Sequence, residues 1–454
     1  MERVQAPRSG PGAPGRSIAT AGCEFRRGDV ADVAGRKGRL AAAGGGPGPR
    51  AARSGASLAI DNLRALVILL VLAFHSVLAY LSFLPAAPFR FSRPPYEWRA
   101  FPIVDPHRWL GFDLFCAWQD VFLMALFFFL SGLFLWPSLT RKGVGRFLRG
   151  RALRLGVPFA AVVAVVMPLA VYPSYLEGAA DPGIDAYWRH LLALPFWPCG
   201  PMWFLWMLLA GDGVVAALYR LMPRRGEAVI RAFAATGAPG GRLAGLLAAS
   251  ALAYMPLALL FGAMPWSAFG PFSFQLSRPL LYAVYFGAGI AFGANGVERG
   301  LFAPAGPLAR RWPLWLVAAL AGFLAWMALT ALTIADQGKA PLWLRAADDL
   351  SFALACFANC FCVLALALRF LRRRSPLFET LTDNAYGMYL VHYVFVVWLQ
   401  YALLGAALPA VVKAGAVFAG TVLASWGVSA ALRRAAAAAR VLWARGPAGA
   451  AAFR

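Results

Sequence analysis

A series of long apolar segments constrains this chain more than any other feature of its sequence. Charged connections and Pro- or Gly-rich connections separate these segments from one another. A helix needs about 20 mostly apolar residues to cross the hydrocarbon core of a bilayer, and each segment is close to that length. The sequence therefore predicts an all-α, polytopic integral membrane protein with about ten transmembrane helices. The expected segments are 57–80, 114–137, 155–173, 201–221, 243–264, 277–296, 313–335, 350–368, 385–404 and 408–432.

The composition agrees with a chain that is solvated mainly by lipid. Hydrophobic residues make up 61% of the sequence, charged residues make up 14%, and the mean hydropathy is +0.64. Soluble domains contain roughly 45–50% apolar residues. We therefore expect the lipid bilayer to be the principal partner of this chain.

The formal net charge of +23 is concentrated in alternate connections. Clusters of Arg and Lys precede the first segment and follow the second, fourth, sixth, eighth and tenth, whereas acidic residues gather in the intervening connections. The positive-inside rule assigns basic connections to the cytoplasm, so an even number of helices places both termini there. Topology thus accounts for the charge, and no nucleic-acid binding is expected.

The ends of the chain are predicted to lie outside the membrane domain. Residues 1–55 are rich in Gly, Ala, Pro and Arg without apolar periodicity, which predicts a disordered basic cytoplasmic tail. Residues 56–434 form the expected transmembrane domain, and 435–454 a short basic cytoplasmic tail. No signal peptide precedes the first segment, so this segment is expected to direct insertion. The six cysteines lack zinc-ligand spacing with a histidine, and no metal site is expected.

Polar side chains at membrane depth are costly, so each one is a functional hypothesis. In the first segment, Asp61, Arg64 and His75 lie on one helix face, with Arg64 and His75 about 16 Å apart. With the amino end inside, Arg64 lies near the cytoplasmic surface and His75 in the outer half of the bilayer. An imidazole can accept a proton from a hydroxyl near neutral pH. Alternatively, His75 only hydrogen-bonds a neighbouring helix, and Arg64 extends to lipid phosphates.

A second basic group lies after the second segment. Arg151 and Arg154 share a helix face if the third helix begins early, and they could clamp a phosphorylated carrier through charge-assisted hydrogen bonds. Their alternative role is to orient the protein by positive charge alone. In the fourth segment, Asp212 is expected to pair with an Arg or another polar group on a neighbouring helix, which the sequence does not identify.

Several further residues are candidates for supporting roles. Ser131 and Gly132 end the second segment, where they offer a hydroxyl and a close helix approach. Trp203 at the outer mouth of the fourth segment is either an interface aromatic or a stacking surface for a sugar. Tyr389 and His392 share a face of the ninth segment, where His392 is either a second proton carrier or a structural histidine.

These residues, in this order, resemble the acyltransferase 3 family of bacterial membrane proteins, and the resemblance covers about 57–405. Short stretches around His75 and from Arg154 to Pro158 are similar to the branch of the family that succinylates periplasmic glucans. The resemblance rests on Asp61-x-x-Arg64 followed by His75, Phe127-Phe128 with Ser131-Gly132, Arg151-x-x-Arg154 leading to Pro158, Trp203-Phe204-Leu205, and Tyr386-Gly-x-Tyr389-Leu-x-His392.

The resemblance implies an O-acyltransferase of the bacterial inner membrane. Such an enzyme would move an acetyl or succinyl group from a cytoplasmic acyl donor, expected to be acyl-CoA, to a hydroxyl of a periplasmic or cell-surface carbohydrate. The implied catalytic residues are His75 as the base and Asp61. The implied donor cradle consists of Arg64, Arg151 and Arg154. The implied acceptor or supporting residues are Ser131, Trp203, Tyr389 and His392.

The resemblance implies no permanently bound cofactor, because acyl-CoA would act as a co-substrate. Proteins of glycan biosynthesis are the expected partners. The alternatives are a polytopic transporter for a small solute or glycan precursor and a non-catalytic membrane scaffold. A transporter should show paired broken helices and polar residues in both halves, whereas the strongest polar stripe here lies on one helix.

Overall fold

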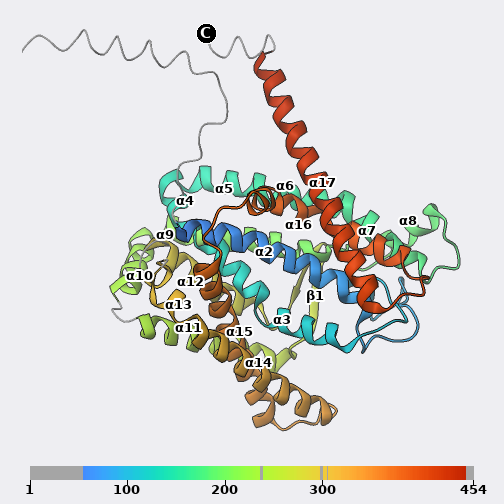
Figure 1. Ribbon diagram of the computed structural model, residues 1–454, viewed down its shortest axis with the longest axis horizontal. Helices are drawn as coiled ribbons and strands as arrows, with labels where there is room; N and C mark the ends of the chain where they lie inside the picture. The colour runs from blue at the N-terminus through green and yellow to red at the C-terminus, as the bar shows by residue number, and fades with distance from the viewer. Residues whose placement is uncertain (1–54, 236–238, 297–299, 304, 446–454) are drawn as a thin grey trace, which may run out of the picture. The chain divides into compact units, whose positions relative to one another are not determined.

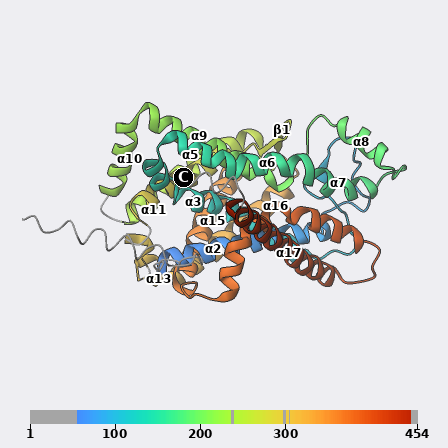
Figure 2. The ribbon, with the colours of Figure 1, turned by 90° about the horizontal axis from the view of Figure 1, so that it is seen from above.

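The computed structural model describes residues 55–235, 239–296, 300–303 and 305–445, and these residues are mostly helical (Figure 1, Figure 2). Of the expected amino-terminal tail, only Gly55 is described, and it begins the first helix. The last helix continues to Arg445, so it includes part of the expected carboxyl-terminal tail, whose remainder, 446–454, lies outside the described residues.

All ten expected segments fall on helices. These are α2 (Gly55–Val77), α3 (Leu110–Gly132), a continuous third stretch of α5 (Val144–Arg151), η3 (Ala152–Gly156), α6 (Val157–Ala161), η4 (Val162–Val166) and α7 (Met167–Leu176), then α9 (Trp203–Leu221), α11 (Pro239–Phe261), α12 (Pro279–Ala294), α14 (Trp312–Ala335), α15 (Leu342–Phe370), α16 (Pro376–Ala402) and α17 (Ala410–Arg445). The connecting helices are α4 (Leu135–Lys142), α8 (Ile184–Leu192), α10 (Pro223–Ala235) and α13 (Pro307–Arg310), with short 3₁₀ turns at η1 (Leu78–Tyr80), η2 (Glu97–Arg99), η5 (Gly200–Met202) and η6 (Gly300–Phe302).

The polytopic, helical character predicted from the sequence is confirmed, but the count of ten crossings is not. Within the described residues, 8 helical stretches are long and apolar enough to cross a membrane. Helix α12 has only 16 residues. Helix α16 is less apolar because it includes His392, Gln400 and several tyrosines, and both of these polar side chains are fully buried. The cytoplasmic placement of both termini stays a prediction.

Helix α2 lies at the centre of the bundle. It contacts α3, α15, α16 and α17, and Figures 1 and 2 show α16 running beside it. Helix α14 differs, because it packs mainly on α15 and exposes large apolar side chains such as Leu320 and Leu324. Exposed apolar surface of this kind is expected where lipid is the solvent, since no free energy is lost by leaving it in hydrocarbon.

Helices α3 and α12 approach each other backbone to backbone. A Cβ atom at Gly132 would meet the Phe286 carbonyl, and one at Gly289 would meet the Phe129 carbonyl, so neither position has room for a side chain. Small residues permit this close packing between membrane helices. The close approach predicted at Gly132 is therefore confirmed, and α12 is its partner.

The third stretch contains two π-helical turns, η3 and η4, which are often found at functional sites. Pro158 has no N–H, so it cannot donate to the carbonyl of Arg154 four residues earlier. The hydroxyl of Tyr386 on α16 donates to that carbonyl. Pro158 thus leaves the Arg154 carbonyl free to accept from Tyr386, and this hydrogen bond joins α16 to the basic end of the third stretch.

A second proline, nearer the other end of this stretch, also leaves a backbone carbonyl for a side chain of α16. Pro173 leaves the carbonyl of Leu169 without its usual helical donor. The indole Nε1 of Trp398 on α16 donates to this carbonyl at 2.9 Å. Two aromatic side chains of α16 therefore hold it along the prolines of the third stretch.

A two-stranded antiparallel hairpin departs from the all-α prediction. Strand β1 (Trp266–Phe269) pairs with β2 (Phe272–Gln275), and Phe269 lies opposite Phe272. The two-residue loop begins with Gly270 at φ +54°, a conformation that favours glycine at the first central position of a hairpin turn. The glycine at this tight turn thus allows a hairpin that the all-α prediction did not include.

The long connection between α2 and α3 is anchored to the helices by buried ion pairing. Lys413 Nζ on α17 lies 2.6 Å from Asp105 Oδ2, and neither side chain is exposed. His107 is 42% exposed and lies 3.2 Å from the same Asp105 carboxylate. The carboxylate of Glu177 accepts a hydrogen bond from the Val104 N–H. This connection is therefore held in a defined position.

Candidate functional site

Two histidines that are far apart in the sequence lie next to each other. His75 is near the carboxyl end of α2 and His392 is in α16, and their ring centroids are 5.2 Å apart. Tyr393 also packs edge-on against His75 at 5.5 Å. Because α16 packs against α2, the two polar positions of two apolar helices meet inside the bundle.

Hydrogen bonds assign the tautomer of each imidazole. His75 Nδ1 lies 2.8 Å from the Val71 carbonyl, and His392 Nδ1 lies 2.6 Å from the Tyr389 carbonyl. A carbonyl can only accept, so each Nδ1 carries the proton and each Nε2 keeps its lone pair. His392 Nε2 is buried without a hydrogen-bond partner among the described residues. The geometry thus leaves a basic nitrogen on His75, as a general base requires.

Helix α16 also fixes the end of the helix that carries His75. The amide Nε2 of Gln400 donates to the carbonyls of His75 and Ser76, at 2.9 and 3.3 Å. The last carbonyls of a helix have no partners within the helix, so this amide replaces the missing donors. The backbone under His75 is therefore positioned by the same helix that supplies His392.

His75 lines a cavity of about 130 Å³ between α2, α3, α9, α12, α16 and the hairpin. Much of its wall is aromatic, and Trp203 stacks on Tyr282 with centroids 5.8 Å apart. The polar members of the lining are His75, Gln119, Asp120 and Gln275, which come from α2, α3 and β2. The cavity thus combines a proton acceptor with hydrogen-bonding groups and aromatic faces.

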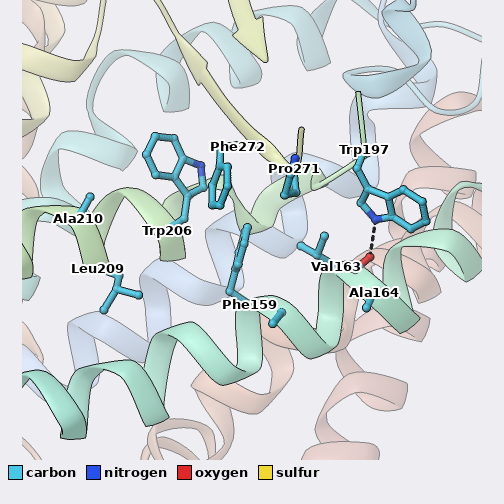
Figure 3. Close-up of a pocket in the computed structure, with 10 residues that line it drawn as sticks. Phe159, Val163, Ala164, Trp197, Trp206, Leu209, Ala210, Pro271 and Phe272 are labelled. Atoms are coloured by element: carbon cyan, nitrogen blue, oxygen red, sulfur yellow. Dashed lines mark hydrogen bonds between the residues drawn. The ribbon is translucent and has the colours of Figure 1, made fainter. Parts of the chain in front are cut away.

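A larger groove of about 830 Å³ lies outside this cavity, between the third stretch, α9 and the hairpin. Its lining is apolar, and Figure 3 shows Phe159, Trp206 and Phe272 together, with Trp197 donating to the Val163 carbonyl. No titratable side chain lines this groove. The smaller cavity is therefore the candidate site for the chemistry.

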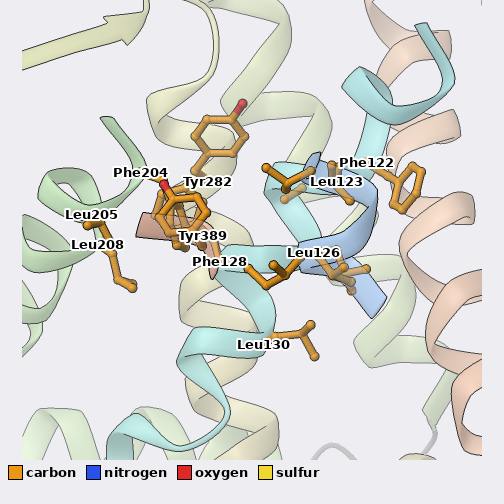
Figure 4. Close-up of a cluster of buried hydrophobic side chains, with 14 of the residues drawn as sticks. Phe122, Leu123, Leu126, Phe128, Leu130, Phe204, Leu205, Leu208, Tyr282 and Tyr389 are labelled. Atoms are coloured by element: carbon orange, nitrogen blue, oxygen red, sulfur yellow. The ribbon is translucent and has the colours of Figure 1, made fainter. Parts of the chain in front are cut away.

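A packed aromatic and aliphatic cluster lies beside the small cavity. Figure 4 shows Phe128, Phe204, Tyr282 and Tyr389 gathered together, and Phe128 stacks on Tyr282 at 4.9 Å. The Tyr389 hydroxyl donates to the Pro201 carbonyl at 2.5 Å, which ties α16 to the start of α9. The cavity walls are thereby set by side chains that have little freedom to move.

The other end of α2 carries the cationic group predicted from the sequence. Arg64 Nη2 donates to the Leu130 carbonyl at 2.8 Å, and Nη1 lies 3.9 Å from Asp61. The guanidinium also lies over the Phe134 ring, 4.4 Å from its centroid. The Arg64 side chain is 36% exposed, so part of its charge stays available to an anion. Asp61 therefore acts on Arg64 in this structure and is remote from the cavity lining.

The structure identifies the partner of Asp212, which the sequence left open. Arg151 Nε lies 3.2 Å from Asp212 Oδ2, and the Asp212 side chain is fully buried whereas Arg151 is 23% exposed. The third helical stretch begins at Val144, so the early start required for Arg151 and Arg154 to share a face is present. The π turn η3 then widens the helix at Arg154, which is exposed. Arg151 is therefore partly neutralised, and Arg154 is the more accessible cation.

The supporting residues predicted from the sequence lie in two places, the cavity at His75 and the cationic end of α2. Trp203 and Tyr389 line the cavity, and His392 lies against His75. Ser131 is half-buried and follows Leu130, whose carbonyl binds Arg64, so it belongs to the cationic end. The geometry does not bring Ser131 to the cavity.

The sequence prediction missed several polar groups of the cavity. Gln119 and Asp120 lie within the apolar second segment, so the rule that singled out His75 could have found them. Asp120 Oδ2 accepts from Arg278 Nη2 at 2.7 Å. Gln275 reaches the cavity only because the hairpin turns back, and no local pattern of the sequence predicted that turn.

The helical bundle and the comparison with known families together define the class of the protein as a membrane-embedded acyltransferase. The family model described as an acyltransferase domain matches residues 57–430, and the chain belongs to this family, acyltransferase 3. This confirms the resemblance and the enzyme prediction over the transporter and scaffold alternatives.

A curated relative gives a narrower, partial similarity. Glucans biosynthesis protein C of Escherichia coli (strain SMS-3-5 / SECEC) is 27% identical to this chain over 153 residues. The matched stretch covers 33% of this chain and 35% of that protein, about a third of each. No solved structure matches this chain.

Proposed function

We propose that this enzyme transfers an acetyl or succinyl group from cytoplasmic acyl-CoA to a hydroxyl of a periplasmic or cell-surface carbohydrate. The observation that carries the proposal is the His75 imidazole, whose Nδ1 is held by the Val71 carbonyl and whose ring lines the cavity of about 130 Å³. The name of the partial relative, which refers to glucans, supports a carbohydrate acceptor.

The proposed reaction uses His75 as the base. The acceptor hydroxyl gives its proton to Nε2 while its oxygen forms a bond to the thioester carbonyl carbon. The bond between carbon and sulfur then breaks, and the imidazolium returns the proton to the departing thiolate. Nδ1 keeps its proton throughout, because the Val71 carbonyl holds it and orients the ring.

The proposed donor site lies at the cationic end of α2. Arg64, Arg151 and Arg154 would bind the phosphates of acyl-CoA, because guanidinium groups form charge-assisted hydrogen bonds with phosphate. The acyl-bearing arm would extend along α2 towards His75, over about 16 Å of helix.

We further propose that the enzyme is located in the bacterial inner membrane, with both tails, 1–55 and 435–454, in the cytoplasm. A reporter that is active only outside the cytoplasm should be active after Gly178 and silent after Gly226. The reverse pattern would contradict the proposed topology, in which the donor binds on the cytoplasmic side and the acceptor on the periplasmic side.

The proposed function is tested by comparing surface and periplasmic glycans from cells with and without the protein. Mass spectrometry should find an acyl ester on a carbohydrate only when the protein is present, and it should be lost with His75→Ala. Identical glycans in the two cell types would contradict a carbohydrate acceptor. Proteins of glycan synthesis encoded by neighbouring genes would support the proposed partners.

A further inference from the structure

Gln119 is a fully buried polar side chain that packing does not explain. Its side chain is 0% exposed, and neither its amide nitrogen nor its amide oxygen has a hydrogen-bond partner among the described residues. Burial of an amide without hydrogen bonds is destabilising, so a ligand that supplies them is the natural explanation. Gln119 lines the same cavity as His75.

The next residue of α3 presents a fixed negative charge to this cavity. Asp120 is 38% exposed and accepts at 2.7 Å from Arg278, whose own side chain is only 2% exposed. Arg278 also donates to the Asp120 carbonyl at 3.1 Å and lies 4.3 Å over the Phe352 ring. Since Arg278 is enclosed behind it, the carboxylate is the member of the pair that a ligand meets.

A third polar group comes from the hairpin. The Nε2 of Gln275 donates to the Ala263 carbonyl at 2.6 Å, so the amide is oriented by the backbone. Its side chain lines the cavity and is 5% exposed. One of its two N–H groups is thereby engaged, and its carbonyl oxygen is an acceptor that Gln275 can offer to a hydroxyl.

We propose that Gln119, Asp120 and Gln275 form a subsite that binds hydroxyl groups of the acceptor next to the one that His75 deprotonates. A hydroxyl both donates and accepts, which matches the paired donor and acceptor of the Gln119 amide. The carboxylate and the Gln275 oxygen accept further hydroxyl protons, and the Trp203 face can pack on a sugar ring. The ligand class is a ring with several neighbouring hydroxyls. This inference rests on the proposed carbohydrate acyltransferase function.

The subsite also predicts that activity and stability respond in opposite directions to one substitution. Gln119→Leu removes two unpartnered polar atoms at similar volume, so the unfolding temperature should stay unchanged or rise. Acylation should nevertheless fall by roughly tenfold or more, because the hydroxyls of the acceptor lose their partners. A residue with a purely structural role would not separate the two readouts.

The test uses full-length protein in cells and in lipid nanodiscs. Acyl esters on cellular glycans are measured for wild type, Gln119→Leu and the control Thr421→Val. Thr421→Val removes a buried hydroxyl that, like the Gln119 amide, has no partner among the described residues, but Thr421 lies outside the cavity lining. Only Gln119→Leu should lose glycan acylation. Binding of acetyl-CoA and succinyl-CoA in nanodiscs should stay within about twofold of wild type for both variants, since neither residue lies at the cationic end.

Undiminished glycan acylation by folded Gln119→Leu would overturn the subsite. A loss of acyl-CoA binding as large as the loss of acylation would also overturn it, because Gln119 would then belong to the donor site. Failure of the proposed function gives a different result, because wild-type cells would then carry no more acyl esters on glycans than cells without the protein. The two failures are therefore distinguishable.

Discussion

The small cavity at His75 and the large groove between the third stretch and α9 differ in what their linings can do. The groove is several times larger, about 830 against about 130 Å³, but its lining is apolar. The cavity contains an imidazole, a carboxylate and two amides, and one of these amides has no hydrogen-bond partner among the described residues. Polar groups buried between apolar helices therefore make the cavity the better candidate site, although the groove has the larger volume.

The largest effects outside the cavity are expected at the cationic end of α2. Arg151→Ala and Arg154→Ala should each weaken acyl-CoA binding by roughly tenfold or more, because hydrogen bonds to charged groups contribute about 1.5–3 kcal/mol. Arg151→Ala should also lower stability, since it leaves the buried Asp212 carboxylate without its cation.

A double variant separates the two consequences for Arg151. Arg151→Ala with Asp212→Asn should recover stability, measured by thermal unfolding in nanodiscs, but it should not recover acyl-CoA binding. Wild-type binding by folded Arg154→Ala would show that the basic residues of this end serve topology alone.

Substitution of two tryptophans that lie one helical turn apart allows a direct comparison of the cavity and the groove. Trp203 lines the cavity and Trp206 lines the groove, and both are half-buried on α9 among aromatic neighbours. Trp203→Ala should lower transfer by about tenfold, as expected for a lost aromatic contact of about 0.5–1.5 kcal/mol beyond area burial. Trp206→Ala should lower stability to a similar extent but leave the transfer rate of folded protein near wild type. The reverse pattern of transfer rates would make the groove a substrate site.

The smallest effect is expected outside the membrane spans, at Glu177. Burial raises the pKa of Glu177 to about 7, with a smaller increase from the Asp105 carboxylate and an opposing decrease from the Val104 N–H. A carboxyl whose pKa is raised by folding stabilises the fold below its unfolded pKa, and this contribution is lost as pH rises through about 7.

Glu177→Gln keeps an oxygen that can accept from the Val104 N–H but removes the titration. Its unfolding temperature should therefore decrease less between pH 6 and pH 8 than that of wild type, as roughly one titrating group is removed. Equal pH dependence of the two proteins would assign the titration to other groups. Transfer activity is not expected to distinguish them.

The helices could be predicted from the sequence because the need for about 20 apolar residues is local. The contacts between helices could not be predicted from the sequence, because they depend on how the helices pack. His75 and His392 were each recognised as polar positions, yet their contact, at a ring distance of 5.2 Å, depends on how α2 packs on α16. The pairing of Arg151 with Asp212 likewise joins two helices whose relative rotation is set by packing.

Other parts of the site escaped prediction for different reasons. The hairpin depends on one glycine at positive φ in a connection of mixed composition, and its tight turn brings Gln275 to the cavity. Arg154 lies in the π turn η3, which an α-helical interpretation of the sequence did not include. Gln119 was missed although the polar pair Gln119-Asp120 within an apolar segment was visible in the sequence.

The most direct test of this account replaces His75 by Gln. The amide keeps hydrogen-bonding groups but cannot accept the proton of the acceptor hydroxyl near neutral pH, and a general base typically contributes about 10²–10⁴-fold to the rate. The account predicts that folded His75→Gln protein, inserted in nanodiscs, binds acyl-CoA normally but transfers acyl groups slower by that factor. Near wild-type turnover by this variant would contradict proton abstraction by His75 and leave the imidazole a structural role.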